Sequence, residues 1–304
     1  MRDNQMTKTQ EELGTMFKTF SSGFDDERLD QFVADSERIM RRPAASLLAQ
    51  AGLDASTTNP FTLLDHACGV GPIAAHLQTT IDRQVLSQSK MLCADINSNL
   101  VETLAKRARK FEWANVETAT LDAQTSGLAA SSFSHVTMNF AMHIVPDPAL
   151  VLQEAARVLQ PGGVFAFTVW HKDNSGWVPD MRSSFEALPF EAPMPSPMPM
   201  APNGKPEFID AALIPEQLRR QGFEDVEVET VEQMVRVESG EDYLRSYGMM
   251  RDWMLRSFWS EESKEKAEGM LDDHIVRHLN EKHQGQGWDL TWTYIMVTCR
   301  KPAN

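Results

Sequence analysis

Short apolar runs alternate with longer amphipathic stretches between Phe61 and Trp170. The short runs have the length of buried strands, whereas the longer stretches carry apolar residues three and four positions apart, the spacing of a helix face. This alternation predicts a parallel sheet covered by helices. We expect strands near 61–65, 91–95, 115–121, 134–140 and 163–170, helices near 72–81, 98–112 and 147–158, and only a loop between the third and fourth strands.

The pattern changes on either side of this region. Residues 1–60 are polar and helix-prone, with apolar residues at helical spacing over 29–48 and Gly52 as the expected stop. Eight of the 16 prolines lie between 179 and 206, so residues 171–214 are expected to form a loop or lid without regular structure. Beyond them we expect a helix near 215–221, a strand near 225–237, helices near 239–259 and 261–283, and a last strand near 290–299.

These elements predict an α/β fold with a doubly wound sheet of about seven strands, the last antiparallel, and helical additions over the carboxyl ends of the strands. The domain plan is an N-terminal helical segment or cap over 1–60 and a main domain over 61–304. We place a lid insertion at about 171–214 and a helical cap at about 239–287. Methionines and aromatic residues concentrate in these additions, where with Phe17 and Phe20 they either enclose an apolar ligand or form ordinary core.

A glycine turn follows the first expected strand, in the run Leu63-Leu64-Asp65-His66-Ala67-Cys68-Gly69-Val70-Gly71-Pro72. An apolar strand ends on an acid, and small residues then open a helix. Gly69 and Gly71 have no Cβ, so the backbone can approach a ligand closely. Pro72 suits the first turn of the following helix. The run predicts a nucleotide-type site at this edge of the sheet.

Two kinds of ligand use such a turn, and Asp65 discriminates between them. Residues 69–74 also fit the loose dinucleotide fingerprint, with Asp95 near the distance expected for a ribose-binding acid. A dinucleotide would place its pyrophosphate over the turn, where the carboxylate would repel it. S-Adenosylmethionine has no phosphate and brings an amino group and a sulfonium, which an acid can hold. We favour S-adenosylmethionine; a dinucleotide, or a strand end without a ligand, remains the alternative.

Two more carboxylates follow expected strands. Asp95 ends the run Met91-Leu92-Cys93-Ala94-Asp95, where its two oxygens can accept both ribose hydroxyls. The alternative is that it caps the next helix. Asp122 ends the third strand and could accept the adenine amino group, or it could simply form a turn.

A further run, Val158-Leu159-Gln160-Pro161-Gly162-Gly163-Val164-Phe165-Ala166-Phe167, stops a helix at Pro-Gly-Gly and leads directly into an apolar strand. Together with the glycine turn and the carboxylates, it resembles the class I S-adenosylmethionine-dependent methyltransferases over about residues 61–170, and more loosely at the C-terminal strands. The family motif is acid-x-Gly-x-Gly-x-Gly. This chain has Ala67 at the first glycine position, which we expect to be tolerated if Ala67 keeps a negative φ.

Within that family the chain is most similar to fungal small-molecule methyltransferases of natural-product pathways, such as the gliotoxin bis-thiomethyltransferase. Three runs carry this similarity: Trp177-Val178-Pro179, Gly222-Phe223-Glu224-Asp225-Val226 and Phe258-Trp259-Ser260-Glu261-Glu262.

The resemblance implies a Rossmann-like class I methyltransferase fold, S-adenosyl-L-methionine as cofactor and methyl transfer to S or O of a small, mostly apolar molecule such as a secondary metabolite. The alternatives are a nicotinamide-dependent reductase and a non-catalytic, cofactor-binding regulatory protein of the same fold. By resemblance, Asp95 contacts the ribose and Asn139 lies near the methionine end. The remaining contacts are Asp65, Ala67, Gly69 and Gly71 with the methionine part, and Asp122 and Ala123 with the adenine.

Methyl transfer to a poorly acidic acceptor needs a base. His143 and His171 both follow expected strands at the ligand-binding edge, so either could serve, and either could be structural. A thiol acceptor could ionise by itself and need neither. His274 and His278 have metal-ligand spacing, but no acid or cysteine completes a set, and we expect no metal.

The net charge of −14 argues against partners that need a basic surface. With 43 acidic and 29 basic residues, neither nucleic acid nor an anionic membrane is an expected partner, and a small molecule is. The one basic cluster, Lys106-Arg107-Ala108-Arg109-Lys110, is interpreted as a solvated helix face. Three scattered cysteines and the absence of an apolar leader at the start of this sequence predict a cytoplasmic protein. Oligomeric state stays open.

Overall fold

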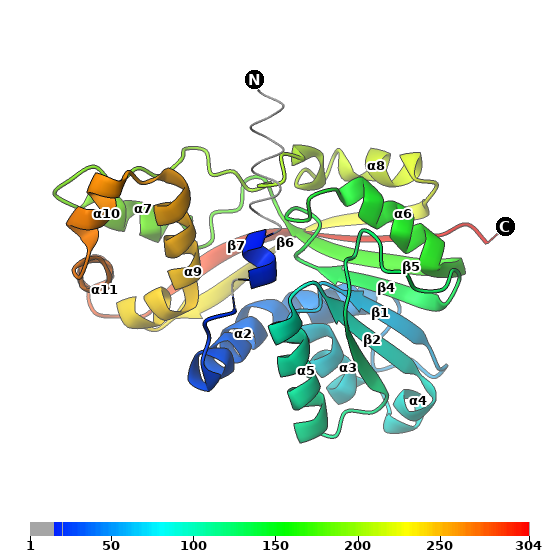
Figure 1. Cartoon of the computed structure of the whole chain (residues 1–304). Helices are drawn as coiled ribbons and strands as arrows, with labels where there is room; N and C mark the ends of the chain where they lie inside the picture. Colours follow the sequence, from blue (N-terminus) through cyan, green and yellow to red (C-terminus); the bar gives the residue numbers. More distant parts are fainter. Residues whose placement is uncertain (1–14, 20, 304) are drawn as a thin grey trace. The chain divides into compact units, whose positions relative to one another are not determined.

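The computed structural model describes residues 15–19 and 21–303 (Figure 1). These residues form two compact units, which we describe separately. Of the described residues, unit 1 comprises 15–19, 21–172, 200–231 and 294–303, and unit 2 comprises Asp173–Pro199 and Glu232–Thr293.

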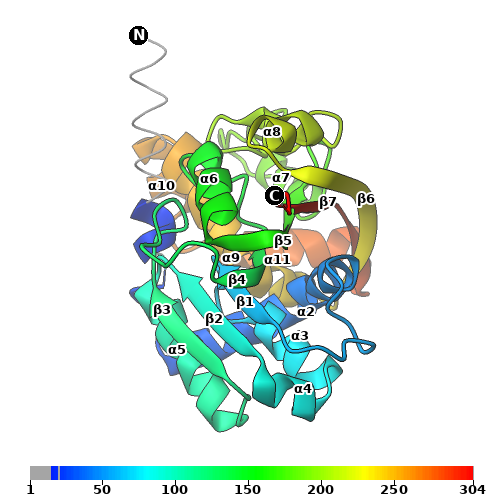
Figure 2. The same cartoon turned by 90° about the vertical axis from the view of Figure 1, so that its right-hand side faces the viewer.

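The strands form one seven-stranded sheet in the order β3-β2-β1-β4-β5-β7-β6. The pairs β1–β2, β2–β3, β1–β4 and β4–β5 are parallel, whereas β5 and β7 are antiparallel. The doubly wound sheet with an antiparallel last strand is thereby confirmed (Figure 2). The strands are β1 Thr62–His66, β2 Lys90–Asp95, β3 Val116–Thr120, β4 Phe133–Asn139, β5 Leu159–Trp170, β6 Glu224–Val237 and β7 Trp288–Arg300.

Alternate residues along the central strands pack into two cores, one on each face of the sheet. Leu64, Val136 and Phe165 belong to the core that includes helices α6 and α8. Leu63 and Ala166 belong to the core that includes α2, α3 and α4. This alternation is expected for a sheet covered on both faces. The helices of unit 1 are α2 Asp26–Gln50, α3 Pro72–Thr80, α4 Arg83–Gln88, α5 Ser98–Lys110, α6 Pro148–Val158 and α8 Ile214–Arg220, with the 3₁₀ turn η1 Pro206–Phe208.

The Pro-Gly-Gly run differs from the expected turn. Strand β5 begins at Leu159, directly after α6, and the run lies inside the strand. Phe133 pairs with Leu159 but His135 pairs with Val164, so this part of β5 contains extra residues that bulge from the ladder. Gly162 has φ +74°, which permits the bulge. The pair Gly162-Gly163 therefore lies in a bulge within β5, and not in the expected turn between a helix and a strand.

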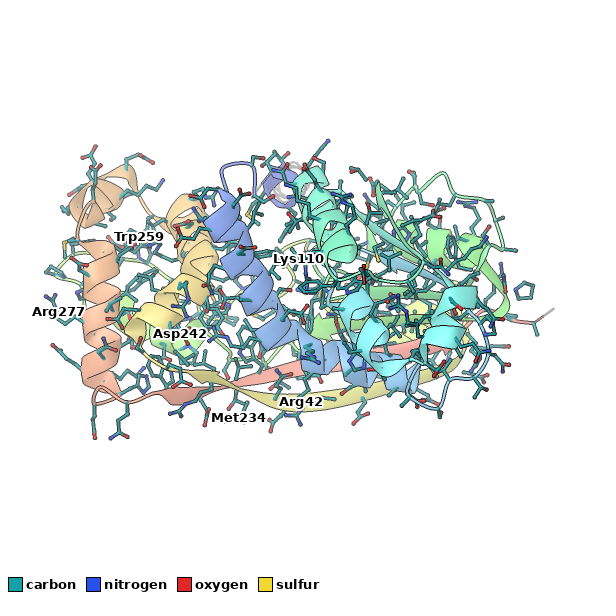
Figure 3. All side chains as sticks on the ribbon, turned by 90° about the horizontal axis from the view of Figure 1, so that it is seen from below. Arg42, Lys110, Met234, Asp242, Trp259 and Arg277 are labelled. Carbon is teal, nitrogen blue, oxygen red and sulfur yellow. The ribbon has the colours of Figure 1, made fainter. Side chains whose placement is uncertain are left out.

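Unit 2 contains a helix that the proline density hid. Helix α7, Val178–Glu186, has its only proline, Pro179, in the first turn, where a missing N–H costs nothing. The expected helix over 261–283 is two helices, because Gly269 at φ +73° separates them. Asp242, Trp259 and Arg277 mark this unit in Figure 3. Its other helices are α9 Gly240–Phe258, α10 Glu261–Ala267 and α11 Leu271–Lys282.

Residues 191–199, which are rich in Pro and Met (the Pro/Met tract), are held within unit 2 by side-chain hydrogen bonds to their backbone. Arg182 donates to the carbonyls of Met194 (3.1 Å) and Pro195 (2.6 Å). Trp259 Nε1 donates to Pro193 O at 3.1 Å, and Ser263 Oγ donates to Glu191 O at 2.8 Å. The tract has no regular structure, as expected, yet it is packed.

Within residues 15–19 and 21–303, no helix combines the length and the apolar character that crossing a bilayer requires.

Candidate active site

A cavity of about 640 Å³ opens in unit 1 where strands β2, β3 and β4 end. Its volume lies within the usual range for small-molecule sites. Five of the residues predicted from sequence line it, together with residues from the N-terminal segment and the loops after β2, β3 and β4. The lining residues are Thr15, Phe17, Lys18, Ala67, Asp95, Ile96, Leu100, Leu121, Asp122, Ala123, Gln124, Asn139, Phe140, Ala141, Ile144, Val145 and Pro146.

Asp65 lies at the end of β1 but is not among the residues that line the cavity. Its side chain is buried, Oδ1 accepts a hydrogen bond from Thr137 Oγ1 at 2.8 Å, and Oδ2 has no hydrogen-bond partner. Burial raises the pKa of this carboxyl to about 7, against the hydrogen bond from Thr137, and the nearby Asp95 adds to the rise. A buried carboxyl with one unsatisfied oxygen favours a nearby positive charge.

The glycine turn uses its small residues in three different ways. Ala67 lines the cavity with φ +52°, so the negative φ that was the condition for tolerating alanine here is not met, and the backbone of Ala67 has a left-handed conformation. Gly69 N donates to Asp95 Oδ2 at 2.9 Å. A Cβ on Gly71 would lie 2.8 Å from Leu104 Cδ1, so this glycine permits contact between the turn and α5. Gly69 and Gly71 do not line the cavity.

Asp95 lines the cavity at the end of β2 and holds the turn beside it. Oδ2 accepts from Gly69 N, and Oδ1 accepts from Asn97 N, each at 2.9 Å. Burial raises the pKa of Asp95, while these backbone N–H groups act in the opposite direction. Each carboxylate oxygen retains a further acceptor site. Asn97, and not Asp95, provides the N-cap of α5.

Asp122 and Gln124 connect the loop after β3 to the loop after β4. Asp122 accepts from Gln124 N at 2.8 Å and from Gln124 Nε2 at 3.1 and 3.2 Å, so it does form a turn. Gln124 Oε1 in turn accepts from Asp147 N at 3.0 Å. Asp122, Ala123 and Gln124 all line the cavity, and the turn-forming and ligand-binding interpretations of Asp122 are therefore compatible.

The end of β4 is a strained backbone locked by aromatic packing. Asn139 lines the cavity and accepts from Thr168 Oγ1 at 2.6 Å. The next residue, Phe140, has φ +56°, which is unusual for a bulky side chain. Its ring stacks on Trp170 with centroids 4.0 Å apart and meets Tyr294 edge-on at 5.7 Å. Strain of this kind persists only where the surrounding structure enforces it, and it is common at functional sites.

The two candidate bases are not among the cavity-lining residues. His143 is buried, and its Nδ1 has no hydrogen-bond partner. Burial lowers the pKa of His143 to about 3, which keeps the imidazole neutral at physiological pH. His171 is half-buried directly after β5. Their roles as bases stay predictions.

Arg107 corrects the interpretation of the basic run as a solvated face. Its guanidinium donates to Val70 O in the glycine turn and, at 2.6 Å, to Glu37 Oε1 on α2. It also lies over the Trp113 ring, 5.3 Å from the centroid. Arg109 and Lys110 are exposed, as expected, and Lys110 is labelled in Figure 3.

The spaced histidines of α11 contact protein groups. His274 Nε2 lies 2.9 Å from Ser184 O, and His278 Nε2 lies 3.2 Å from Ser183 Oγ. Among the described residues, no three His, Cys, Asp or Glu side chains are grouped as metal ligands.

The sequence did not single out several cavity residues. Ile96 and Leu100 follow Asp95 within five residues, and the run Ile144-Val145-Pro146 follows β4. Their positions behind strand ends could have indicated them. Thr15 and Lys18 lie far away along the chain, and no motif marks them. Phe17 was expected to meet a ligand and does line the cavity, whereas Phe20 lies outside the described residues.

The donor set fits S-adenosylmethionine better than a dinucleotide. Asp95 offers free acceptor sites for hydroxyl groups, and the unsatisfied Asp65 oxygen favours a cation in the neighbourhood of the turn. Of the described residues that line the cavity, three are charged, and two of them, Asp95 and Asp122, are acids, which disfavours a pyrophosphate.

Comparison with known proteins agrees with this geometry. Residues 64–167 match the family described as "Methyltransferase domain". The fold is similar to phosphoethanolamine N-methyltransferase 2 of Haemonchus contortus, solved with S-adenosyl-L-methionine (TM-score 0.55, 17% identity, 94% of this chain and 60% of that chain). It is also similar to YcgJ of Bacillus subtilis (TM-score 0.52, 13% identity, 86% of this chain and 100% of that chain). The chain is a class I S-adenosylmethionine-dependent methyltransferase.

Its curated relatives include fungal methyltransferases. The acetylaranotin bis-thiomethyltransferase of Aspergillus terreus is 28% identical over 298 residues, which cover 96% of this chain and 99% of that protein. Methyltransferase tpcH of Aspergillus fumigatus is 26% identical over 260 residues, covering 85% of this chain and 91% of that protein. Both matches extend far beyond the methyltransferase domain, and the expected relation to this group is confirmed.

Proposed function

We propose that this enzyme methylates a sulfur or oxygen atom of a small, mostly apolar secondary metabolite. The similarity over 96% of the chain to a bis-thiomethyltransferase carries this proposal. That similarity includes the segments outside residues 64–167, where an acceptor-specific part of a methyltransferase would lie. Among sulfur and oxygen, the name of this relative favours sulfur.

The cavity supports an apolar acceptor. Phe17, Phe140, Ile144, Val145 and Pro146 give it an apolar wall, while its acids come from the ends of β2 and β3. A ligand with a polar nucleoside and an apolar partner would match this division. The roles of residues 171–214 as a lid, of 239–287 as a helical cap and of 1–60 as an N-terminal cap stay predictions.

S-Adenosylmethionine supplies, when bound, a methyl group on a positively charged sulfur. The chain's own contribution is to bind, orient and exclude water. Asp95 would accept the ribose hydroxyls, and Asp122 with Ala123 would receive the adenine. Asp65, behind Ala67, would stabilise the positive charge without touching the solvent. Asn139, fixed by Thr168, would border the methionine part.

The acceptor must lose a proton during the reaction. A thiol can lose it to solvent, because its ordinary pKa lies near 8.5. His143 would act as a base only after a change that brings it to the acceptor, and its lowered pKa makes it a weak base. We therefore propose that the acceptor thiol ionises by itself, without a histidine base, and that the resulting thiolate is the nucleophile.

All three cysteines are buried thiols without a disulfide. This supports a reducing compartment such as the cytoplasm as the site of action.

The test is incubation with methyl-labelled S-adenosylmethionine and matched sets of three apolar acceptors that differ only in carrying a thiol, a phenol or a carboxylate. Mass spectrometry should detect one labelled methyl per reactive thiol and an equal amount of S-adenosylhomocysteine. If only the phenols became labelled, the methylated atom would be oxygen and not sulfur. Cofactor binding with no labelled product in any set would favour the non-catalytic alternative, and NADPH-dependent reduction would favour the reductase.

A further inference from the structure

The N-terminal segment, described over residues 15–19 and 21–23, is hydrogen-bonded to the loop that follows Asp95. Asn97 Nδ2 donates to Phe17 O at 3.0 Å, and Ser21 Oγ donates to Asn97 Oδ1 at 3.0 Å. Asn99 Nδ2 donates to Ser21 O at 3.3 Å. Because Asn97 N also bonds to Asp95, one asparagine joins this segment to the cavity wall.

This segment brings a positive charge to the cavity. Over residues 15–19 and 21–303, Lys18 is the only Lys or Arg that lines the cavity. The other charged side chains that line it there are Asp95 and Asp122. Arg107, the basic side chain at the glycine turn, is already paired with Glu37 at 2.6 Å and does not line the cavity. Lys18 is exposed, so its flexible side chain can reach a ligand without a cost of burial.

The charges of the cofactor leave one group without a partner in the assigned site. Its sulfonium and amino groups are positive and match the acids, and its hydroxyls match Asp95. Its methionine carboxylate is an anion, which neither Asp95 nor Asp122 can stabilise. An ammonium group would stabilise it through a charge-assisted hydrogen bond.

We propose that Lys18 binds the carboxylate of the cofactor's methionine part, so that the N-terminal segment completes the cofactor site. The inference rests on the assignment of S-adenosylmethionine as cofactor. It makes Lys18 a binding residue for the cofactor, distinct from any role in accepting the apolar substrate. Asn97 is then a positioning residue, which holds the backbone of the segment next to Asp95.

The test compares two ligands that differ only in the carboxylate, S-adenosylmethionine and decarboxylated S-adenosylmethionine, by isothermal titration. Lys18→Met should weaken binding of S-adenosylmethionine about 10-fold, between the effect of an exposed ion pair and that of a charged hydrogen bond. Binding of the decarboxylated ligand should stay within about 2-fold. Lys106→Met is the matched control, because Lys106 is exposed on α5 and pairs with Glu102 outside the cavity.

Three results separate the possible failures. Equal losses for both ligands in Lys18→Met would mean that the segment acts only as a cover, and the proposal would be wrong. Unchanged binding of both ligands, with a raised KM for the acceptor, would mean that Lys18 contacts the acceptor and not the cofactor. This result would also overturn the proposal. If the unmodified protein bound neither ligand, the cofactor assignment itself would fail. Lys18→Arg should retain most of the affinity, which distinguishes lost charge from lost folding.

Discussion

Asp65 is buried at the end of β1, and burial raises the pKa of its carboxyl to about 7. The sequence interpretation gave it direct contact with the cofactor, yet the cavity wall near it is formed by Ala67. The unsatisfied oxygen of Asp65, two residues before Ala67, can still act on a bound cation, because a buried charge is poorly screened. Asp65 is thus a group whose ionisation the cofactor's positive charge should favour.

We predict that affinity for S-adenosylmethionine rises as the pH increases from 6 to 8. A folded-state pKa raised to about 7 means that part of the carboxyl is protonated in this window, and binding of a sulfonium favours its ionised form. S-Adenosylhomocysteine lacks the sulfonium, so its affinity should depend less on pH. The measurement is the ratio of the two dissociation constants at each pH.

Asp65→Asn is the matching variant, because its amide keeps an acceptor for Thr137 Oγ1. The pH dependence of the ratio should disappear in this variant. A ratio that changes with pH equally in both proteins would assign the effect to another group, and Asp65 would then have no electrostatic role.

At the scale of elements, α5 fixes the glycine turn from outside the cavity. Gly71 allows the turn to approach Leu104, and Arg107 holds the carbonyl of Val70. The same arginine reaches Glu37 on α2, so two helices meet at the turn. The turn's shape therefore depends on helix side chains that no glycine motif contains.

We expect Arg107→Met to cost about 1–3 kcal/mol of unfolding free energy, because it leaves the half-buried Glu37 carboxylate and the Val70 carbonyl without their donor. Cofactor affinity should fall as well, since the turn loses a support. Arg109→Met, on the exposed side of α5, should stay within about 0.5 kcal/mol. Chemical unfolding and ligand titration of both variants measure the changes in stability and affinity. Equal effects in the two variants would mean that Arg107 is an ordinary solvent-exposed residue of α5 and does not support the turn.

Within unit 2, α9 and α11 touch through a glycine. A Cβ on Gly240 would lie 2.5 Å from Val276 O, and Gly240 N donates to Asn280 Oδ1 at 2.8 Å. Neither the backbone of α11 nor this hydrogen bond can shift freely. The close approach of the helices therefore requires a residue without a side chain.

Gly240→Ala should destabilise the protein by about 1–3 kcal/mol through overpacking. Gly248→Ala in the same helix has open space around its new Cβ and should be neutral or stabilising by up to about 1 kcal/mol. Both variants should bind S-adenosylhomocysteine normally, because every described residue that lines the cavity belongs to unit 1. Thermal unfolding with ligand titration checks this, and a loss of binding in Gly240→Ala would show that unit 2 supports the cofactor site.

At the scale of the whole molecule, local patterns predicted the sheet, because most strands of unit 1 carry their own apolar run and a polar residue stands at or just after the ends of β1 to β4. Asp95, Asp122 and Asn139 could be placed in one cavity for that reason. Lys18 and Asn97 could not, since their roles depend on a contact between residues 76 or more positions apart. Helix α7 was not predicted, because Pro179 in its first turn was counted with the prolines that argue against regular structure. The φ of Ala67 was not predicted either, because the turn around it sets this angle.

The most direct test of the account is equilibrium dialysis of labelled S-adenosylmethionine against the protein and Asp95→Ala, with and without excess NADPH. We predict saturable binding, weakened in the variant by about 1–3 kcal/mol as a charged hydrogen bond is lost, and unaffected by NADPH. Displacement of the label by NADPH, or equal binding to both proteins, would contradict the assignment of this cavity to the methyl donor.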